Sequence, residues 1–218
     1  MLRRQNMKKA FSLAEILLTL MIIGVIAGMT IPGLQKDAQN RTTVTNLKKV
    51  YSELNQATSL VLTDNMTNKF YKTDAWGSKE KFYNNFVYKY LNVIKTCEQG
   101  SQSDCWGQDW DWADGKIFLL SNGIAVSFTD VGDSQNADVY YMRILVDTNG
   151  PKPPNKNAVD RFSLNITGEG QVYAGLRPGA NYDDTSWFYQ MVKSNCNNGQ
   201  SADYCAALVV MDGWQMNY

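Results

Sequence analysis

The feature that most constrains this chain is a run of mostly apolar residues near its N-terminus, at positions 11–34. A helix of that length spans roughly 36 Å, which is enough to cross a hydrocarbon core of about 30 Å. The ten residues before the run contain four cations and no acid. A basic flank of this kind marks the cytoplasmic side of a membrane helix. The sequence therefore predicts a membrane-spanning helix whose basic N-terminal end lies in the cytoplasm.

Glu15 is the one formal charge inside this run. An acid within an apolar membrane helix costs about 2.5–3.5 kcal/mol on insertion scales, so it needs a partner. No Lys or Arg occurs at positions 11–34. Cleavage before Phe11 would supply a cation, because the new α-amino group would lie one turn from Glu15 or beside it in a neighbouring copy. The alternative is an ordinary secretory signal, whose apolar stretch is shorter, or an uncleaved anchor, which would leave Glu15 unpaired.

These residues resemble the N-terminal signal of type IV pilins and type II secretion pseudopilins. The shared pattern is a short basic leader, a cleavage point, Phe, an acid, and an apolar run with Pro, and here it reads Lys8-Lys9-Ala10, Phe11, Glu15 and Pro32. The resemblance implies that prepilin peptidase cuts between Ala10 and Phe11 and methylates the new amino group of Phe11. It also implies that Glu15 pairs with the Phe11 amino group of an adjacent subunit.

One position departs from the family pattern. The residue before the cut is usually Gly, and here it is Ala10. Because Ala is also small, we expect slower processing rather than none. A start at Met7 instead of Met1 would shorten the leader without changing the cut.

Composition excludes several classes of function. The chain has no His, which removes Ser-His-Asp and Cys-His catalysis and almost every zinc enzyme site. It carries 21 basic and 21 acidic residues, so without the four leader cations 17 basic residues face 21 acidic ones, a net charge of −4. A mildly acidic chain argues against nucleic-acid binding. No phosphate loop or nucleophile motif occurs, so we expect no enzyme.

The helix should break or loosen at Pro32 and Gly33, because Pro lacks an N–H and clashes with the preceding turn. Beyond this point apolar residues recur at intervals of three and four, which predicts an amphipathic helix. Its apolar stripe consists of Val44, Leu47, Val50, Tyr51, Leu54, Ala57 and Val61, with Thr58 as its polar member. We expect this helix to lay its stripe on a globular head and to end at Asp64.

A second helix is expected at 79–95, with Ser78 as its N-cap. Its largely aromatic stripe is more typical of a core than of a ligand site, and consists of Phe82, Phe86, Val87, Tyr90, Leu91 and Ile94.

The middle of the chain predicts strands. Segments 116–121 and 124–129 flank Asn122-Gly123, which suits a type I′ hairpin turn. Further strands are expected at 139–146, 161–166 and 171–174, and short connections between strands imply an antiparallel meander. Helical patterns return at 185–193, with Thr185 or Ser186 as N-cap, and at 202–211.

This order of elements predicts the α+β class, with a long N-terminal helix packed on an antiparallel sheet. The order again resembles the pilin fold. The corresponding division is a leader at 1–10, a transmembrane and polymerisation helix at 11–34, and a head domain at 35–218.

Four cysteines lie in the part of the chain expected outside the cytoplasm, where disulfides form: Cys97, Cys105, Cys196 and Cys205. Four cysteines allow three pairings, which sequence alone does not settle. We favour the local pairs, 97–105 and 196–205. Each bridge would add roughly 2–3 kcal/mol by restricting the unfolded chain.

Two oxygen-rich stretches are candidate metal sites. Segment 109–114 contains three Asp residues, but their spacing does not fit an EF-hand loop. The second stretch contains Asp147, Asn149 and Asp160, with an ordinary turn rich in Asn, Gly and Pro as the alternative. Because some secretion pseudopilins carry calcium in a loop of their sheet region, the resemblance favours this second stretch. Apart from that structural calcium, we expect no cofactor.

Three tryptophans lie close together, at Trp106, Trp110 and Trp112. They could stack on a sugar or a partner surface, or pack beneath the sheet as large aromatic residues usually do. We expect one exposed tryptophan at most.

The sequence and the resemblance together predict a structural subunit of a type IV pilus-like or type II secretion pseudopilus filament. Its expected partners are prepilin peptidase, other pilin or pseudopilin subunits and an inner-membrane assembly platform. The expected location is the bacterial inner membrane, with a single span and the head outside the cytoplasm, and after assembly a periplasmic or extracellular filament. The alternative is a single-pass, membrane-anchored binding module outside the cytoplasm.

Overall fold

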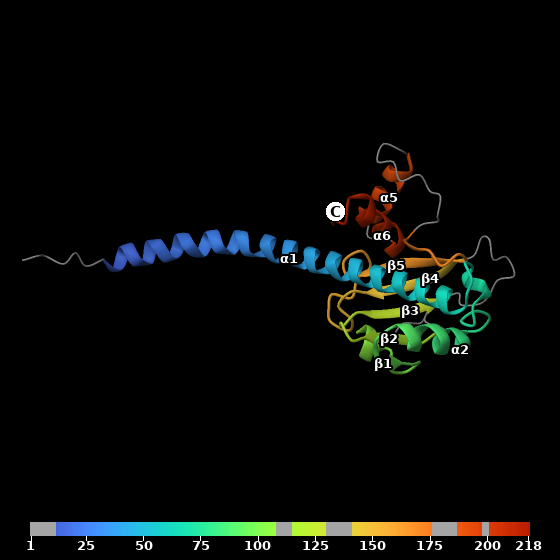
Figure 1. Ribbon diagram of the computed structural model, residues 1–218. Helices are drawn as coiled ribbons and strands as arrows, with labels where there is room; N and C mark the ends of the chain where they lie inside the picture. Colours follow the sequence, from blue (N-terminus) through green and yellow to red (C-terminus); the bar gives the residue numbers. More distant parts are fainter. Residues whose placement is uncertain (1–11, 108–114, 130–140, 176–186, 198–200) are drawn as a thin grey trace, which may run out of the picture. The chain divides into compact units, whose positions relative to one another are not determined.

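The computed structural model describes residues 12–107, 115–129, 141–175, 187–197 and 201–218. The chain forms two units, residues 1–39 and residues 40–218. Helix α1, Leu13–Asp64, contributes its first half to one unit and its second half to the other (Figure 1). Each unit is described by itself.

The predicted interruption at Pro32 and Gly33 is wrong, because α1 continues through both residues. A proline inside a helix costs about 3 kcal/mol, since it removes one backbone hydrogen bond and crowds the preceding turn. In a helix of 52 residues that local loss is small beside the hydrogen bonds that remain on either side.

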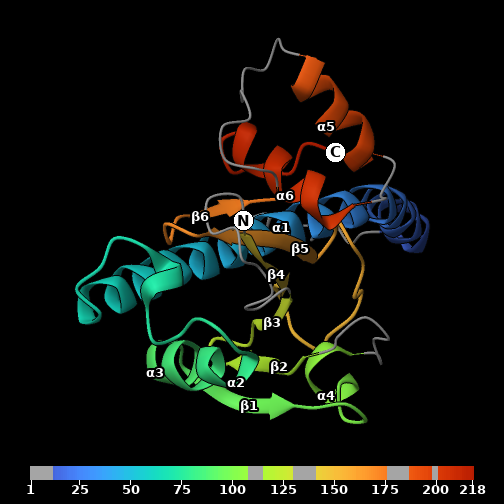
Figure 2. The ribbon, with the colours of Figure 1, turned by 90° about the vertical axis from the view of Figure 1, so that its right-hand side faces the viewer.

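The second half of α1 is amphipathic, as predicted. Its buried residues are Thr43, Val44, Leu47, Val50, Leu54, Ala57, Thr58 and Val61, and Tyr51 beside them is partly buried. The helix ends at Asp64, also as predicted. This half packs on a sheet of six strands within the second unit (Figure 2).

The sheet is an antiparallel meander whose strands follow one another in chain order. The strands are β1 Val93–Cys97, β2 Ile117–Leu120, β3 Ala125–Thr129, β4 Tyr141–Asp147, β5 Arg161–Thr167 and β6 Val172–Ala174. The predicted meander is confirmed for β2 to β6, and residues 139–140 of the predicted third strand lie outside the described residues.

Strand β1 was not predicted, and the helix expected at 79–95 is correspondingly too long. Ser78 caps it as expected, since its side chain accepts a hydrogen bond from the Lys81 N–H at 3.2 Å. The helical stretch then runs as α2 Lys79–Phe82, a π-helical turn η2 Tyr83–Val87 and α3 Tyr88–Tyr90.

The backbone becomes extended at Leu91, with φ −110° and ψ 140°. The following residues include Val93, Ile94 and Thr96, whose branched β-carbons favour strands. Ile94, predicted as core, is 64% exposed at this edge of the sheet. Apolar residues therefore keep a helical spacing in the sequence after Leu91, although β-propensity and pairing in the sheet make this segment a strand.

The β2–β3 connection is a hairpin, but its turn is not of type I′. Of the loop residues Ser121, Asn122 and Gly123, Gly123 alone has a positive φ, of 83°. The Gly123 N–H donates to the Leu120 carbonyl at 2.9 Å, and the Leu120 N–H donates to the Ile124 carbonyl at 2.8 Å. This is the three-residue loop in which a type I turn is followed by a left-handed residue.

Asn122 explains why this loop forms. Its side-chain oxygen accepts from the Ile124 N–H at 3.0 Å, and its amide donates to both carboxylate oxygens of Glu53 at 3.1 Å. The hairpin is thereby tied to the second half of α1.

The two faces of the sheet carry different clusters, because successive side chains of a strand point in opposite directions. Phe118, Val126 and Ile144 belong to the larger core, which includes the buried stripe of α1 and the aromatic residues of α2 to α3. The smaller cluster on the other face consists of Cys97, Cys105, Trp106, Ile117 and Ala125.

The remaining helices are η1 Phe70–Lys72, a 3-10 turn, and α4 Ser103–Trp106, α5 Trp187–Asn197 and α6 Ala202–Met211. Helix α6 agrees with its predicted bounds and packs against β5, with α5 beside it (Figure 2). The predicted caps Thr185 and Ser186 lie outside the described residues.

Candidate functional site

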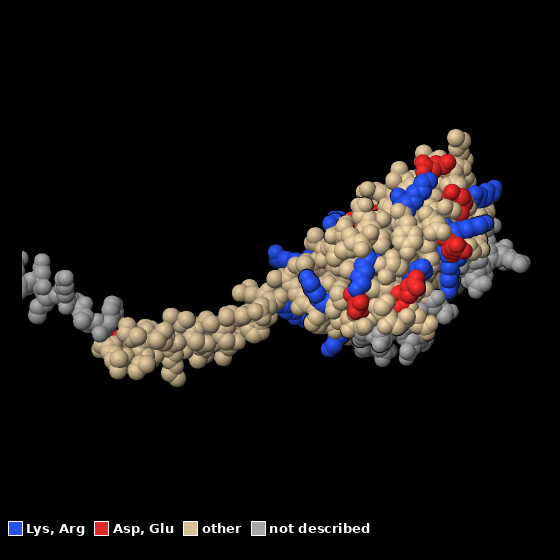
Figure 3. All heavy atoms as spheres, turned by 90° about the horizontal axis from the view of Figure 1, so that it is seen from below, with Lys and Arg blue, Asp and Glu red and all other residues tan. Residues whose placement is uncertain are grey.

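The first half of α1 is an apolar helix with no buried side chain among its described residues. It is long and apolar enough to cross a membrane, and its most apolar stretch has no buried residue among the described part of the chain. Leu13, Met29 and Leu34 are 79%, 78% and 68% exposed. Figure 3 shows this stretch as an almost unbroken tan surface, whereas Lys, Arg, Asp and Glu are frequent on the second unit. Such a surface is stable only against lipid or other apolar helices.

Glu15 lies in the first turn of α1, where it forms a reciprocal cap with Ser12. The Ser12 N–H donates to Glu15 Oε2 at 3.0 Å, and the Ser12 hydroxyl donates to the same oxygen at 3.2 Å. In return the Glu15 N–H donates to Ser12 Oγ at 3.2 Å. This is a capping box, in which Ser and the Glu three residues later satisfy each other's backbone N–H groups.

The sequence contains the signal for this cap, although our sequence interpretation did not use it. Ser12-Leu-Ala-Glu15 has the S-x-x-E spacing directly before an apolar run, which is the pattern of a capping box. Glu15 therefore has a structural role at the helix start in addition to any partner in another chain. Both hydrogen bonds from Ser12 reach the same carboxylate oxygen, Oε2, and they do not neutralise the charge of Glu15.

The other residues of the predicted cleavage and assembly site are placed only in part. Ala10 and Phe11 lie outside the described residues, so cleavage, methylation and the pairing of Glu15 stay predictions. Pro32 lies inside α1, in an exposed stretch of the helix.

Both predicted disulfides are confirmed, with Cys97 bonded to Cys105 and Cys196 bonded to Cys205. The first bridge joins the end of β1 to α4 and is buried in the smaller cluster. The second joins α5 to α6 and is buried in the larger core. Disulfides of this kind persist in oxidising compartments.

One of the predicted metal residues, Asp147, is paired with a buried arginine. Asp147 accepts from the Arg161 Nε–H at 2.8 Å, and both side chains are buried. Asp160, also buried, accepts from the backbone N–H groups of Asn155 and Lys156 at 2.8 and 2.7 Å.

The second Asp147 oxygen accepts from the Asn149 N–H at 3.2 Å, so all four carboxylate oxygens of Asp147 and Asp160 have protein donors. The described residues contain no group of three or more His, Cys, Asp or Glu placed to hold a metal ion. A calcium ion would compete with Arg161 for Asp147, and calcium binding here stays a prediction. The Asp residues of segment 109–114 lie outside the described part.

The same arginine connects this loop to the first disulfide. The Arg161 guanidinium lies 4.8 Å from the centre of the Trp106 ring and donates to the Trp106 carbonyl. Burial raises the pKa of Asp147 to about 7, against the opposing effect of Arg161, which favours the ionised form. Trp106 is 1% exposed, so it packs beneath the sheet as expected for a large aromatic residue. Trp110 and Trp112 lie outside the described residues.

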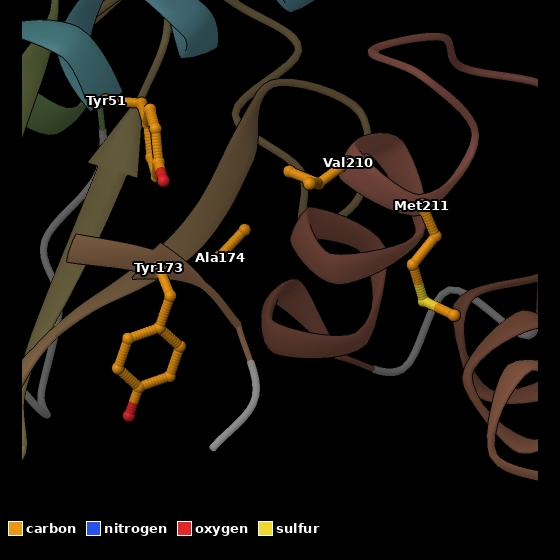
Figure 4. Close-up of a pocket in the computed structure, with 5 residues that line it drawn as sticks. All are labelled: Tyr51, Tyr173, Ala174, Val210 and Met211. Atoms are coloured by element: carbon orange, nitrogen blue, oxygen red, sulfur yellow. The ribbon is translucent and has the colours of Figure 1, made fainter. Parts of the chain in front are cut away.

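A cavity of about 430 Å³ lies at the β6 edge of the sheet (Figure 4). Tyr51 reaches it from α1, Tyr173 and Ala174 from β6, and Val210 and Met211 from α6. The Tyr51 hydroxyl donates to the Val172 carbonyl at 3.0 Å, which fixes one wall. The lining contains no carboxylate, amine, imidazole or thiol. The cavity therefore has room for an apolar group, but its lining supplies none of those four groups for acid–base or nucleophilic chemistry.

Comparison with known proteins identifies one family. The model of the family of unknown function DUF6613 matches residues 33–218. No curated protein and no solved structure matches the chain.

Proposed function

The chain belongs to the DUF6613 family of unknown function, and we propose that it is a structural subunit of a type IV pilus-like or type II secretion pseudopilus filament. The observation that carries this proposal is the first half of α1, an exposed apolar helix with a single carboxylate in its first turn. In a plain membrane anchor an uncharged Gln would serve the capping box equally well, so the charge of this carboxylate, which is costly in lipid, would have no use. A subunit that assembles through this helix does have a use for it.

In the proposed mechanism prepilin peptidase removes residues 1–10 and methylates the amino group of Phe11. Before assembly the subunit resides in the inner membrane with its head outside the cytoplasm. The two disulfides support this position of the head. An inner-membrane assembly platform then moves the helix from lipid into a bundle of identical or related helices. The protein performs no chemistry of its own.

Assembly by this route requires a specific interaction, because lipid is as apolar as the helices that leave it. Bundling therefore gains little hydrophobic free energy, and close packing must direct it. Within the bundle an unpaired carboxylate would be severely penalised. The proposed partner of Glu15 is the amino group of Phe11 in the adjacent subunit, which sets the register.

The capping box allows the charge of Glu15 to be tested separately from its hydrogen bonds. Glu15→Gln keeps an acceptor for Ser12 and removes the charge, since Gln also serves in capping boxes. We expect this variant to be inserted and cleaved but not to form regular filaments. Electron microscopy of filaments and a blot for the cleaved form, made on the same cells, provide the measurement. Regular filaments from cleaved Glu15→Gln protein would contradict the pairing.

The second candidate is a membrane-anchored binding module, and the cavity beside Tyr51 is the observation that favours it. Mass spectrometry of the N-terminus of the membrane protein separates the two candidates. A chain that begins with methylated Phe11 supports the filament subunit. A chain that retains residues 1–10 supports the anchored module.

A further inference from the structure

We infer that the Arg161 side chain supplies the cation that holds the β4–β5 connection, residues 148–160, so that the unaltered head needs no calcium ion there. The resemblance to secretion pseudopilins favours calcium at Asp147, Asn149 and Asp160. The contacts of these three residues favour the arginine. The inference concerns the second unit alone and does not rest on the proposed function.

Strand pairing places Arg161 against Asp147. Asp147 is the last residue of β4, Arg161 is the first residue of β5, and the two are direct cross-strand partners. Opposite charges at directly opposed positions of a sheet attract each other. The Arg161 Nε–H donates to Asp147 Oδ2 at 2.8 Å, and the two side chains are 7% and 0% exposed. Because water does not reach this pair, the guanidinium is what balances the carboxylate.

Trp106 holds the same guanidinium from another direction. The guanidinium lies 4.8 Å from the centre of the Trp106 ring and donates to the Trp106 carbonyl. Trp106 follows Cys105, whose bridge to Cys97 joins α4 to β1. A metal ion that displaced Arg161 from Asp147 would therefore also have to break its contacts with Trp106.

The carboxylate oxygens of this connection already have donors. Asp147 Oδ1 accepts from the Asn149 N–H at 3.2 Å, and the two Asp160 oxygens accept from the N–H groups of Asn155 and Lys156. Among the side-chain oxygens of the three predicted metal residues, only Asn149 Oδ1 has no hydrogen-bond partner in the described part of the chain. One such oxygen is far fewer than the six to eight that calcium takes.

Electrostatic repulsion acts in the same direction. A calcium ion bound to Asp147 Oδ2 would lie within about 5.4 Å of Arg161 Nε, given the usual calcium–oxygen distance. Two cations this close in a buried environment repel each other strongly. Without the guanidinium, however, the head would retain two buried carboxylates, Asp147 and Asp160. A divalent cation should then be accepted in its place.

Thermal unfolding of full-length protein in detergent, followed by tryptophan fluorescence, tests this replacement in calcium and in a chelator. We expect the unaltered chain to unfold at the same temperature, within about 1 °C, in both buffers, because an ion that does not bind the folded state does not stabilise it. Arg161→Met should unfold about 6–20 °C lower in the chelator, since it leaves a buried carboxylate unpaired. Calcium should restore at least about half of that loss.

The matched control is Arg161→Met with Asp147→Asn, which removes the arginine and the carboxylate that it pairs with. Calcium should not raise the unfolding temperature of this double variant. The control also subtracts any calcium held by the Asp residues of segment 109–114, which both variants retain. Arg161→Lys keeps a cation, so its unfolding temperature should not respond to calcium.

Two results would overturn the inference. One is a rise in the unfolding temperature of the unaltered protein in calcium that Asp147→Asn abolishes. The other is an Arg161→Met protein that calcium stabilises no more than the double variant. If Arg161→Met does not fold in the chelator, its refolding yield in calcium and in the chelator provides the same comparison. Neither result bears on filament formation, which the Glu15 variants test separately.

Discussion

The two halves of α1 form one continuous helix, but their apolar side chains lie in opposite environments. In the second half, one stripe of side chains is buried against the sheet and the opposite side is polar. In the first half no buried stripe exists, because apolar residues occur on all sides and none of them is buried. A helix that is apolar all round belongs in a membrane or in the centre of a larger assembly.

The difference shows what each half requires. The second half finds its stabilising partner within its own chain, through Leu47, Val50 and Leu54, each 0% exposed. The first half has no such partner in the described part of the chain, so its stability depends on lipid or on other copies. The family model matches residues 33–218, which contains the self-sufficient part. Substitutions in each half test this difference.

The largest expected effect is that of Glu15→Ala, which removes the charge and the carboxylate half of the capping box and leaves the backbone N–H that donates to Ser12 Oγ. Insertion and cleavage should remain largely intact, because the apolar run is unchanged. Filaments should be absent or irregular, since nothing neutralises the amino group of Phe11 in the bundle. Blotting for cleavage and imaging filaments in one strain measures both. If uncleaved precursor accumulates instead, Glu15 serves the peptidase and the assembly role loses its support.

Matched leucine truncations should separate the two halves. Leu54→Ala deletes a fully buried side chain from the head and should lower its free energy of unfolding by about 2–5 kcal/mol. Leu18→Ala, at a residue that is 58% exposed, should change that free energy by less than about 0.5 kcal/mol.

Denaturant unfolding of full-length protein in detergent, followed by tryptophan fluorescence, measures both variants. Equal losses of stability in Leu54→Ala and Leu18→Ala would show that the first half of α1 is part of the folded head.

A smaller effect is expected at the polar contact that fastens the second half of α1 to the β2–β3 hairpin. Asn122→Ala removes hydrogen bonds to the charged Glu53, which are worth about 1.5–3 kcal/mol. Asn122→Asp should cost more than Asn122→Ala, because it places a second carboxylate against Glu53. The same unfolding measurement checks both, and Ser121→Ala serves as a control in the same loop. An Asp variant as stable as the original protein would mean that this contact is not formed in solution.

Much of the fold follows from periodicity and turn chemistry. The apolar stripe from Val44 to Val61 predicted the packed half of α1, and Asn122-Gly123 predicted the hairpin. Further strands were predicted near β4, β5 and β6, and the local bridges that we favoured among three possible pairings are those that the structure contains. In each case the signal is local, so the sequence alone carries it.

The errors arose where distant parts of the chain decide the outcome. Strand β1 follows a helical pattern without a break in polarity, and its conformation depends on pairing with β2. The turn at Asn122 has a sequence suited to type I′, but its contact with Glu53, 69 residues away, accompanies a different loop. We did not predict that Arg161 lies beside Asp147, because the sequence shows where carboxylates occur but not which cation contacts them.

The smallest expected effect concerns the cap at the start of the first half. Ser12→Ala removes the hydroxyl that accepts from the Glu15 N–H, and loss of an N-cap typically costs about 1 kcal/mol. That local loss should speed amide exchange in the first turn of α1 roughly fivefold, measured by hydrogen exchange in lipid nanodiscs. Ser12→Thr, which retains a hydroxyl, should exchange like the original protein. Because Ser12→Ala keeps the charge of Glu15, its filaments should still form, whereas those of Glu15→Gln should not. If Ser12→Ala abolishes filaments as completely as Glu15→Gln does, the cap rather than the charge governs assembly, and the proposed pairing with Phe11 must be replaced.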